Sequence, residues 1–146
     1  MAATETVVVD ASALLPLILP DVTGRKRFSV DLVTDAEAGR IRLLVPQVCH
    51  LELAAAVTKK VRAGVIAVPA AAEFFELVDS LSLDTVVESM SARELFEAAM
   101  RLGCQVADSI YVEMARDLGA TLATLDGGML QACRAAGVAT RAVFAV

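Results

Sequence analysis

The chain has 146 residues, of which 57% are hydrophobic and 21% are charged. This length and composition predict one compact domain over residues 1–146 and exclude a largely disordered chain. The net charge of −5 argues against a protein that holds nucleic acid by neutralising many phosphates.

The predicted elements alternate between strands and helices from the first residues onward. A β-branched run over residues 6–9 predicts a strand buried on both faces, and Asp10 ends it. The next predicted elements are a short helix over 12–19, a helix over 28–38, a strand over 40–45 and a helix from Pro46 to residue 62. The second half follows with a helix over 69–81, a strand over 83–87, a helix from the S-x-x-E capping box at Ser91 to residue 102, a helix over 107–118, a strand over 121–125, a helix over 129–135 and a strand over 138–143.

Alternation of this kind predicts an α/β fold, a three-layer sandwich with helices on both faces of a central five-stranded parallel sheet. Ligands of such sheets bind beyond the carboxyl ends of the strands, near the point where the strand order reverses. Asp10 and Asp126 both follow predicted strands directly, and we expect them at that edge.

Four carboxylates stand out from the other acidic residues by their positions. Asp10 and Asp126 follow buried strands, where a carboxylate is costly unless it is solvated, hydrogen-bonded or metal-bound, although either one is also a good helix N-cap. Glu52 interrupts the apolar stripe of its helix, and the alternative for it is a solvated helix edge. Asp108 lies in the first turn of its helix, where capping is the stronger alternative.

The remaining side chains narrow the chemistry. Most other acids fall on polar helix positions and are expected on the solvated surface: Glu73, Glu76, Asp79, Glu94, Glu97, Glu113 and Asp117. Three widely spaced cysteines and a single histidine, His50, exclude a structural zinc site and a disulfide framework. Hard oxygen ligands without a histidine base point to magnesium or manganese chemistry, with phosphoryl transfer as the natural reaction.

Four segments carry a family resemblance: TVVVDASALL, LVPQVCHLELAAAV, VADSIYVEMARDLGA and TLATLDGGML. Together they resemble a PIN domain, most closely the VapC-type toxins of VapBC toxin–antitoxin systems, over essentially the whole chain. The resemblance implies a metal-dependent ribonuclease with Mg²⁺ or Mn²⁺ at an acidic cluster. It assigns metal binding and catalysis to Asp10, Glu52, Asp108 and Asp126, and a supporting role to the hydroxyls of Ser12 and Thr124.

The same resemblance implies partners. These are single-stranded or structured RNA, a cognate antitoxin protein and a second copy of the chain in a homodimer. Basic residues over 25–27 and at Lys59, Lys60 and Arg62 are candidates for tracking RNA, with solvated helix charges as the alternative. Gly127 and Gly128 depart from the family pattern, because many relatives carry basic or polar residues there.

Other classes of protein fit the sequence less well. No run reaches the roughly 20 apolar residues of a membrane helix, and the first basic residue follows the first apolar run, so we expect a cytoplasmic protein without membrane contact. A phosphoacceptor receiver domain needs a lysine after the last strand, but the last lysine is Lys60. A dehalogenase-like phosphatase needs a second aspartate where Ser12 stands. The alternative that stays open is a PIN-like scaffold that binds a protein or RNA without cleaving.

Overall fold

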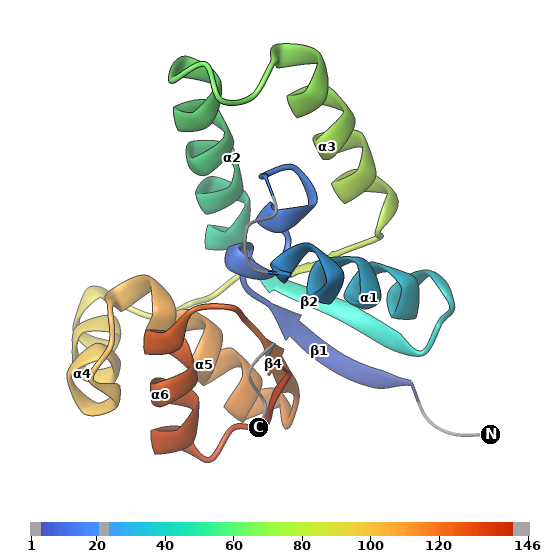
Figure 1. The fold of residues 1–146 in the computed structure, drawn as a ribbon. Helices are drawn as coiled ribbons and strands as arrows, with labels where there is room; N and C mark the ends of the chain where they lie inside the picture. The colour runs from blue at the N-terminus through green and yellow to red at the C-terminus, as the bar shows by residue number, and fades with distance from the viewer. Residues whose placement is uncertain (1–3, 21–23, 142–146) are drawn as a thin grey trace.

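A five-stranded parallel sheet forms the centre of the computed structural model, which describes residues 4–20 and 24–141 (Figure 1). Its strands are β1 (Glu5–Val9), β2 (Ile41–Pro46), β3 (Asp84–Val86), β4 (Thr121–Ala123) and β5 (Thr140–Arg141), in the order β3-β2-β1-β4-β5. Val7, Val8 and Val9 are fully buried, as their unbroken β-branched run predicts. The predicted α/β class with a five-stranded parallel sheet is confirmed.

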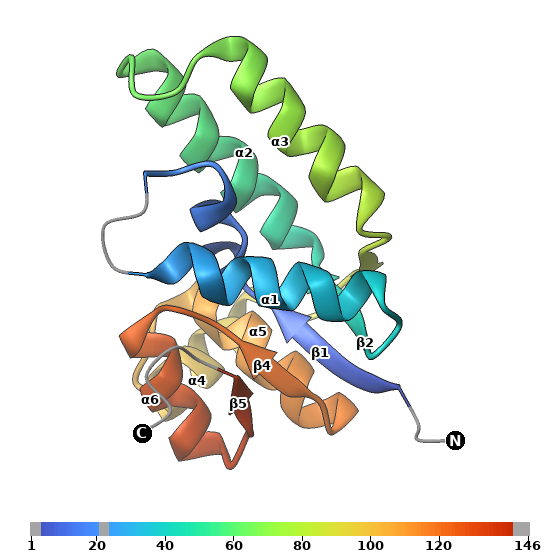
Figure 2. The ribbon, with the colours of Figure 1, turned by 45° about the vertical axis from the view of Figure 1, so that its right-hand side comes forward.

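Helices fill the connections between the strands. The α-helices are α1 (Arg25–Glu37), α2 (Gln47–Arg62), α3 (Val68–Ser80), α4 (Ala92–Leu102), α5 (Val106–Leu118) and α6 (Gly127–Ala136). Helix α1 packs beside β2, whereas α5 crosses β1, β2 and β4, with α4 and α6 against it. Figure 2 shows α1 in front of the sheet, and α2 and α3 extending beyond it as a helical pair. Among the described residues, no helix combines the length and apolarity needed to cross a bilayer.

The strand order reverses between two neighbouring strands. From β1 the chain moves outward to β2 and β3, then returns past them to β4 and moves outward the other way to β5. Right-handed crossovers in opposite directions place their helices on opposite faces of the sheet. The connections that leave the carboxyl ends of β1 and β4 therefore run to opposite faces of the sheet. The last residues of these strands, Val9 and Ala123, are paired with each other. This edge is where a doubly wound sheet holds its ligand.

The segment after β1 differs from its prediction. Instead of one helix over 12–19, it forms two 3₁₀ turns, η1 (Ala11–Ala13) and η2 (Leu15–Leu17). Pro16 explains the difference, because it has no N–H to donate and its ring clashes with the carbonyl four residues earlier. The chain instead makes tighter bonds three residues apart, such as Leu17 N–H to the Leu14 carbonyl at 3.1 Å.

The last strands also differ in their limits. Strand β4 ends at Ala123, two residues before its predicted end, because the segment that follows turns toward Asp10. Strand β5 covers only Thr140–Arg141 of the predicted strand over 138–143, and residues 142–143 lie outside the described part of the chain.

The prediction that Glu113 lies on the solvated surface is wrong. Glu113 is buried, with 7% of its surface exposed, and it forms ion pairs with Arg101 on α4 and Arg116 on α5. Helical periodicity alone cannot show that α4 covers this face of α5, since that contact joins separate elements. The two arginines compensate the charge that burial would otherwise disfavour.

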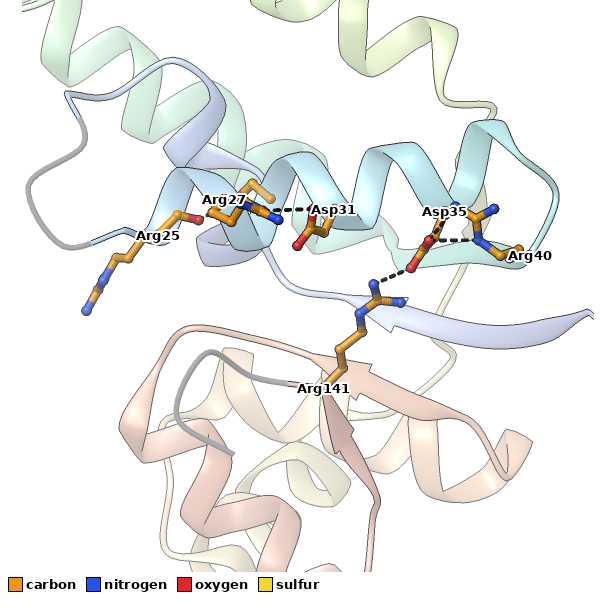
Figure 3. A network of polar contacts seen from close by, with 7 residues as sticks. Arg25, Arg27, Asp31, Asp35, Arg40 and Arg141 are labelled. Carbon is orange, nitrogen blue, oxygen red and sulfur yellow. Dashed lines mark hydrogen bonds and ion pairs between the residues drawn. The ribbon is translucent and has the colours of Figure 1, made fainter. Parts of the chain in front are cut away.

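A polar network ties α1 to the start of β2 and to the edge strand β5. Asp35 accepts a hydrogen bond from Nε of Arg40 at 2.9 Å, and Arg141 reaches it from β5 (Figure 3). Hydrogen bonds from Arg141 and then Arg40 hold the pKa of Asp35 below its ordinary value. Its ionised form is therefore favoured in the folded protein.

We expect Asp35→Asn to lower the melting temperature at pH 7 by about 2 °C, the scale of a surface ion pair. Because the folded pKa is depressed, this stabilisation is present above the unfolded pKa of about 4 and is lost as the pH falls through the folded pKa. Thermal unfolding of both proteins between pH 2 and 7 checks this. Asp31→Asn, which breaks only the exposed pair with Arg27, is the control. A deficit at pH 2 equal to that at pH 7 would contradict the prediction.

Candidate functional site

Asp10 lies at the carboxyl end of β1, and its side chain is held by three donors. The residue is 5% exposed and caps the turn η1 by accepting from the backbone N–H of Ser12. Oδ2 also accepts from the Ser12 hydroxyl at 2.9 Å and from the Thr124 hydroxyl. The capping alternative thus applies to Asp10, but capping accounts for only one of these three bonds.

The two hydroxyls also bind the segment that follows β4. The Ser12 Oγ accepts from the backbone N–H of Leu125 at 2.9 Å, and the Thr124 Oγ1 accepts from that of Asp126 at 3.0 Å. Each hydroxyl thus gives its proton to Asp10 and takes one from the backbone. The structure places Ser12 and Thr124 on Asp10, and through them the positions of Asp10 and Asp126 are joined.

Asp126 is the N-cap of α6 and is exposed to solvent. Its Oδ1 accepts from the backbone N–H groups of Gly128 at 2.8 Å and Met129 at 3.2 Å. A Cβ at position 128 would lie 3.3 Å from that same oxygen, so glycine leaves the carboxylate room. The capping alternative for Asp126 is therefore observed, and it places the carboxylate beside the end of β4.

Glu52 projects from α2 and is partly buried. Its Oε1 accepts a hydrogen bond of 2.5 Å from the hydroxyl of Tyr111 on α5. Sequence reasoning missed Tyr111, although a signal existed. It is the only tyrosine of the chain and lies three residues after Asp108, so the two share a helix face.

Asp108 lies in the first turn of α5 but is not its N-cap, which is Gln105. Burial raises the pKa of Asp108 to about 6, and the charges of Asp126, Asp10 and Glu52 add to the rise. A carboxylate with an elevated pKa beside other acids is typical of functional sites. The backbone of Gln105 also hydrogen-bonds the carboxylate, as at a helix start, but burial and the three charges outweigh its lowering effect on the pKa.

The four predicted acids therefore form one electrostatic group. Burial raises the pKa of Asp10 despite its three donors, and the charge of Asp126 contributes. Burial also raises the pKa of Glu52, with further contributions from the charges of Asp10 and Asp126. Residues separated by long stretches of sequence thus repel one another at the switch point of the sheet.

The donor set matches a hard divalent cation in chemistry and charge. All four donors are carboxylates, which Mg²⁺ and Mn²⁺ prefer, and a cation would relieve the repulsion that raises their pKa values. Within residues 4–20 and 24–141, no three acidic, histidine or cysteine side chains are close enough to hold an ion as they stand. The acids must draw closer to share one.

Thiols near the acids are unsuited to act as nucleophiles. Burial raises the pKa of Cys49 to about 12 and that of Cys133 to about 11, so neither is a thiolate near neutral pH. His50 is on the exposed side of α2, where its Nε2 is 2.8 Å from the Thr85 hydroxyl. These groups leave the carboxylates as the chemical feature of this edge.

The predicted basic groups have structural roles in part. Arg27 pairs with Asp31 one turn later on α1 at 3.4 Å. Lys59, Lys60 and Arg62 form the last turn of α2, where positive charge complements the helix dipole. Seven to ten residues separate them from Glu52, roughly 10–15 Å along the helix axis. This placement fits the solvated-helix alternative, and RNA contact by this second group stays a prediction.

A cavity of about 230 Å³ lies elsewhere, between residues 86–90 and α5. Its walls include Glu88, Glu113 and Met114, and none of the four acids lines it. The electrostatic group, rather than this cavity, defines the candidate site.

Fold and site together define a doubly wound α/β protein with an acidic group at the switch point of its parallel sheet. No family model matches the sequence, and no relative was found among curated proteins. Solved structures do resemble it. PAE2754 from Pyrobaculum aerophilum is 22% identical with a TM-score of 0.69, the match covering 94% of this chain and 83% of that one.

Two further structures extend the comparison. A domain of a functionally unknown protein from Methanocaldococcus jannaschii DSM 2661 is 14% identical, with a TM-score of 0.56 and coverage of 98% of this chain and 94% of that one. The PilT N-terminus domain protein SSO1118 from Sulfolobus solfataricus P2 is 12% identical over 94% of this chain and 86% of its own, with a TM-score of 0.47, too low to indicate a shared fold. At these identities, PAE2754 and the Methanocaldococcus jannaschii domain show that this fold is shared, and they indicate nothing about activity.

Proposed function

We propose that this chain is a Mg²⁺- or Mn²⁺-dependent endoribonuclease of the PIN type, acting as the toxin of a type II toxin–antitoxin pair. The observation that carries the proposal is the electrostatic coupling of four acids near the strand-order reversal. Burial, and after it the charges of Asp126, Asp10 and Glu52, raise the pKa of Asp108 to about 6. The parallel sheet and the sequence resemblance to PIN domains support the same reading.

The four carboxylates are the groups that would hold the cation. When bound there, a divalent ion would supply activation of water and neutralisation of charge on the phosphate. The chain's own contribution is orientation. Ser12 and Thr124 fix Asp10 through its Oδ2, and the N-terminus of α6 fixes Asp126 through its Oδ1.

The proposal includes RNA as substrate, a cytoplasmic location, a cognate antitoxin and a homodimer. Apolar surface for a protein partner exists on α4, where Phe96 and Met100 lie one turn apart and are 61% and 69% exposed. Exposed apolar side chains at this spacing suit a helix that packs against a partner.

Addition of millimolar Mn²⁺ is expected to raise the melting temperature by about 5–10 °C. The reason is mass action, since saturation at 100 times the dissociation constant adds about 2.7 kcal/mol to the free energy of unfolding. Differential scanning fluorimetry with and without EDTA measures the shift. Absence of any shift in millimolar Mn²⁺ would favour the scaffold that binds without cleaving.

Activity is tested directly on single-stranded RNA labelled at one end, with Mg²⁺ or Mn²⁺ present. Cleavage that EDTA abolishes supports the proposal. A protein that binds Mn²⁺ but leaves every RNA intact would retain the metal site and lose the assignment as a nuclease.

A further inference from the structure

The hydroxyl of Tyr111 contacts one of the four acids from a neighbouring helix. Tyr111 is 0% exposed, and its hydroxyl donates to Oε1 of Glu52 at 2.5 Å. The bond joins α5 to α2 across 59 positions of sequence. A phenylalanine would fill the same space, so the hydroxyl serves something besides packing.

The helix faces explain why this contact lies under the site. Glu52 follows Cys49 by three residues on α2, and Tyr111 follows Asp108 by three residues on α5, so each pair shares a face. The thiol of Cys49 lies 3.9 Å from the carbonyl oxygen of Val9, the residue before Asp10. Helices α2 and α5 thus meet the end of β1 directly below the carboxylates.

The chemistry of the hydroxyl suits orientation rather than proton transfer. A phenol ionises only at about pH 10, and the Tyr111 side chain is buried, so its hydroxyl is a donor near neutral pH. A phenol has one proton to donate, and here it goes to a single oxygen of Glu52. A hydrogen bond to a charged acceptor is among the strong ones and restricts its rotation.

We infer that Tyr111 is a positioning residue that orients Glu52 toward Asp10 and Asp126, and thereby sets the affinity of the acidic group for a divalent cation. The inference rests on the metal binding in the proposed function, and not on RNA cleavage. In known metal sites, removal of a hydrogen-bond partner of a ligand commonly weakens metal binding roughly 10- to 100-fold.

The test is a double-mutant cycle on Mn²⁺ affinity, measured by isothermal titration calorimetry. Tyr111→Phe is expected to weaken Mn²⁺ binding about 10- to 100-fold in the wild-type background. In the Glu52→Gln background the same change is expected to alter affinity by less than about 2-fold, since the oriented carboxylate is gone. Equal losses in both backgrounds, or no loss in either, would overturn the inference.

Val57→Ala is the matched control, because it shortens a buried side chain of α2 and leaves the Tyr111 hydroxyl on Glu52. Its Mn²⁺ affinity is expected to equal that of the wild type. If wild type itself binds no Mn²⁺, the proposed function and the inference both fail. If wild type and Tyr111→Phe bind it equally, only the inference fails.

A second measurement needs no variant. Tyr111 is the only tyrosine and the chain has no tryptophan, so its near-ultraviolet absorption and emission report on this hydroxyl alone. Titration of the wild-type protein with Mg²⁺ is expected to change the tyrosine spectrum with the midpoint found by calorimetry. A spectrum that stays constant while the cation binds would overturn the inference, even where Tyr111→Phe does not fold.

Discussion

Asp10→Asn is expected to lower metal-dependent RNA cleavage by at least about 100-fold, the scale of losing one charge-stabilising group at an active site. The substitution keeps the shape of the side chain and its bond from the Ser12 N–H, but removes the negative charge that a cation requires. It also replaces one acceptor oxygen with an amide that donates, so the Ser12 and Thr124 hydroxyls must reorient.

Measurement of thermal stability distinguishes a variant that has lost the metal site from one that has lost its fold. Burial raises the pKa of Asp10, which means that its ionised form costs folding free energy at neutral pH. Asp10→Asn is therefore expected to melt no lower than the wild type in EDTA, and to lose the Mn²⁺-dependent rise. Asp79→Asn, an exposed acid on α3, is the charge-matched control and is expected to keep full activity. Cleavage at the wild-type rate by Asp10→Asn would show that the site is wrongly assigned.

Asp108→Asn is expected to abolish the stabilisation by Mn²⁺ and to make the metal-free protein more stable at pH 7. The pKa of Asp108 rises from 3.8 to about 6, so the ionised acid is disfavoured in the folded state. Each pKa unit corresponds to about 1.4 kcal/mol of unfolding free energy. Because solvent screens this partly exposed position, we expect Asp108→Asn to gain only about 1 kcal/mol, which raises the melting temperature by about 3 °C.

The pH dependence has a definite sign. Below pH 3.8 the acid is protonated in both states and Asp108→Asn is expected to melt with the wild type. The advantage of the variant should grow between pH 3.8 and about 6 and stay constant above it. Thermal unfolding in EDTA across this range measures it, with Glu73→Gln on the exposed side of α3 as the control. A variant less stable than wild type at pH 7 would mean that Asp108 acts as a helix-start acid, stabilised by the dipole.

The acids differ in how far the sequence alone could place them. Asp10 and Asp126 follow buried strands, and the structure puts both at the same edge, beside paired residues Val9 and Ala123. Glu52 can be selected from the sequence because it interrupts the apolar face of its helix. Asp108 has the local signature of a helix-start acid, so in the sequence only the family resemblance selects it, and its electrostatic link to the other acids depends on the fold.

Two failures have one physical origin. Glu113 occupies a polar position of its helix, yet α4 covers it, and Tyr111 was passed over because its partner is on another helix. Periodicity describes which residues share a face of one element, and it contains no information on what that face meets. The predicted helix over 12–19 is wrong for a local reason, since Pro16 has no N–H to donate and its ring clashes with the carbonyl four residues earlier.

By itself the sequence determined the order of strands and helices, most of their limits, and the acids at the strand ends, because these follow from local periodicity, glycine and proline. The tertiary structure decided the strand order β3-β2-β1-β4-β5, which reverses between β1 and β4 and brings distant carboxylates to one edge. It also decided their elevated pKa values, since burial and repulsion depend on distances that only folding sets.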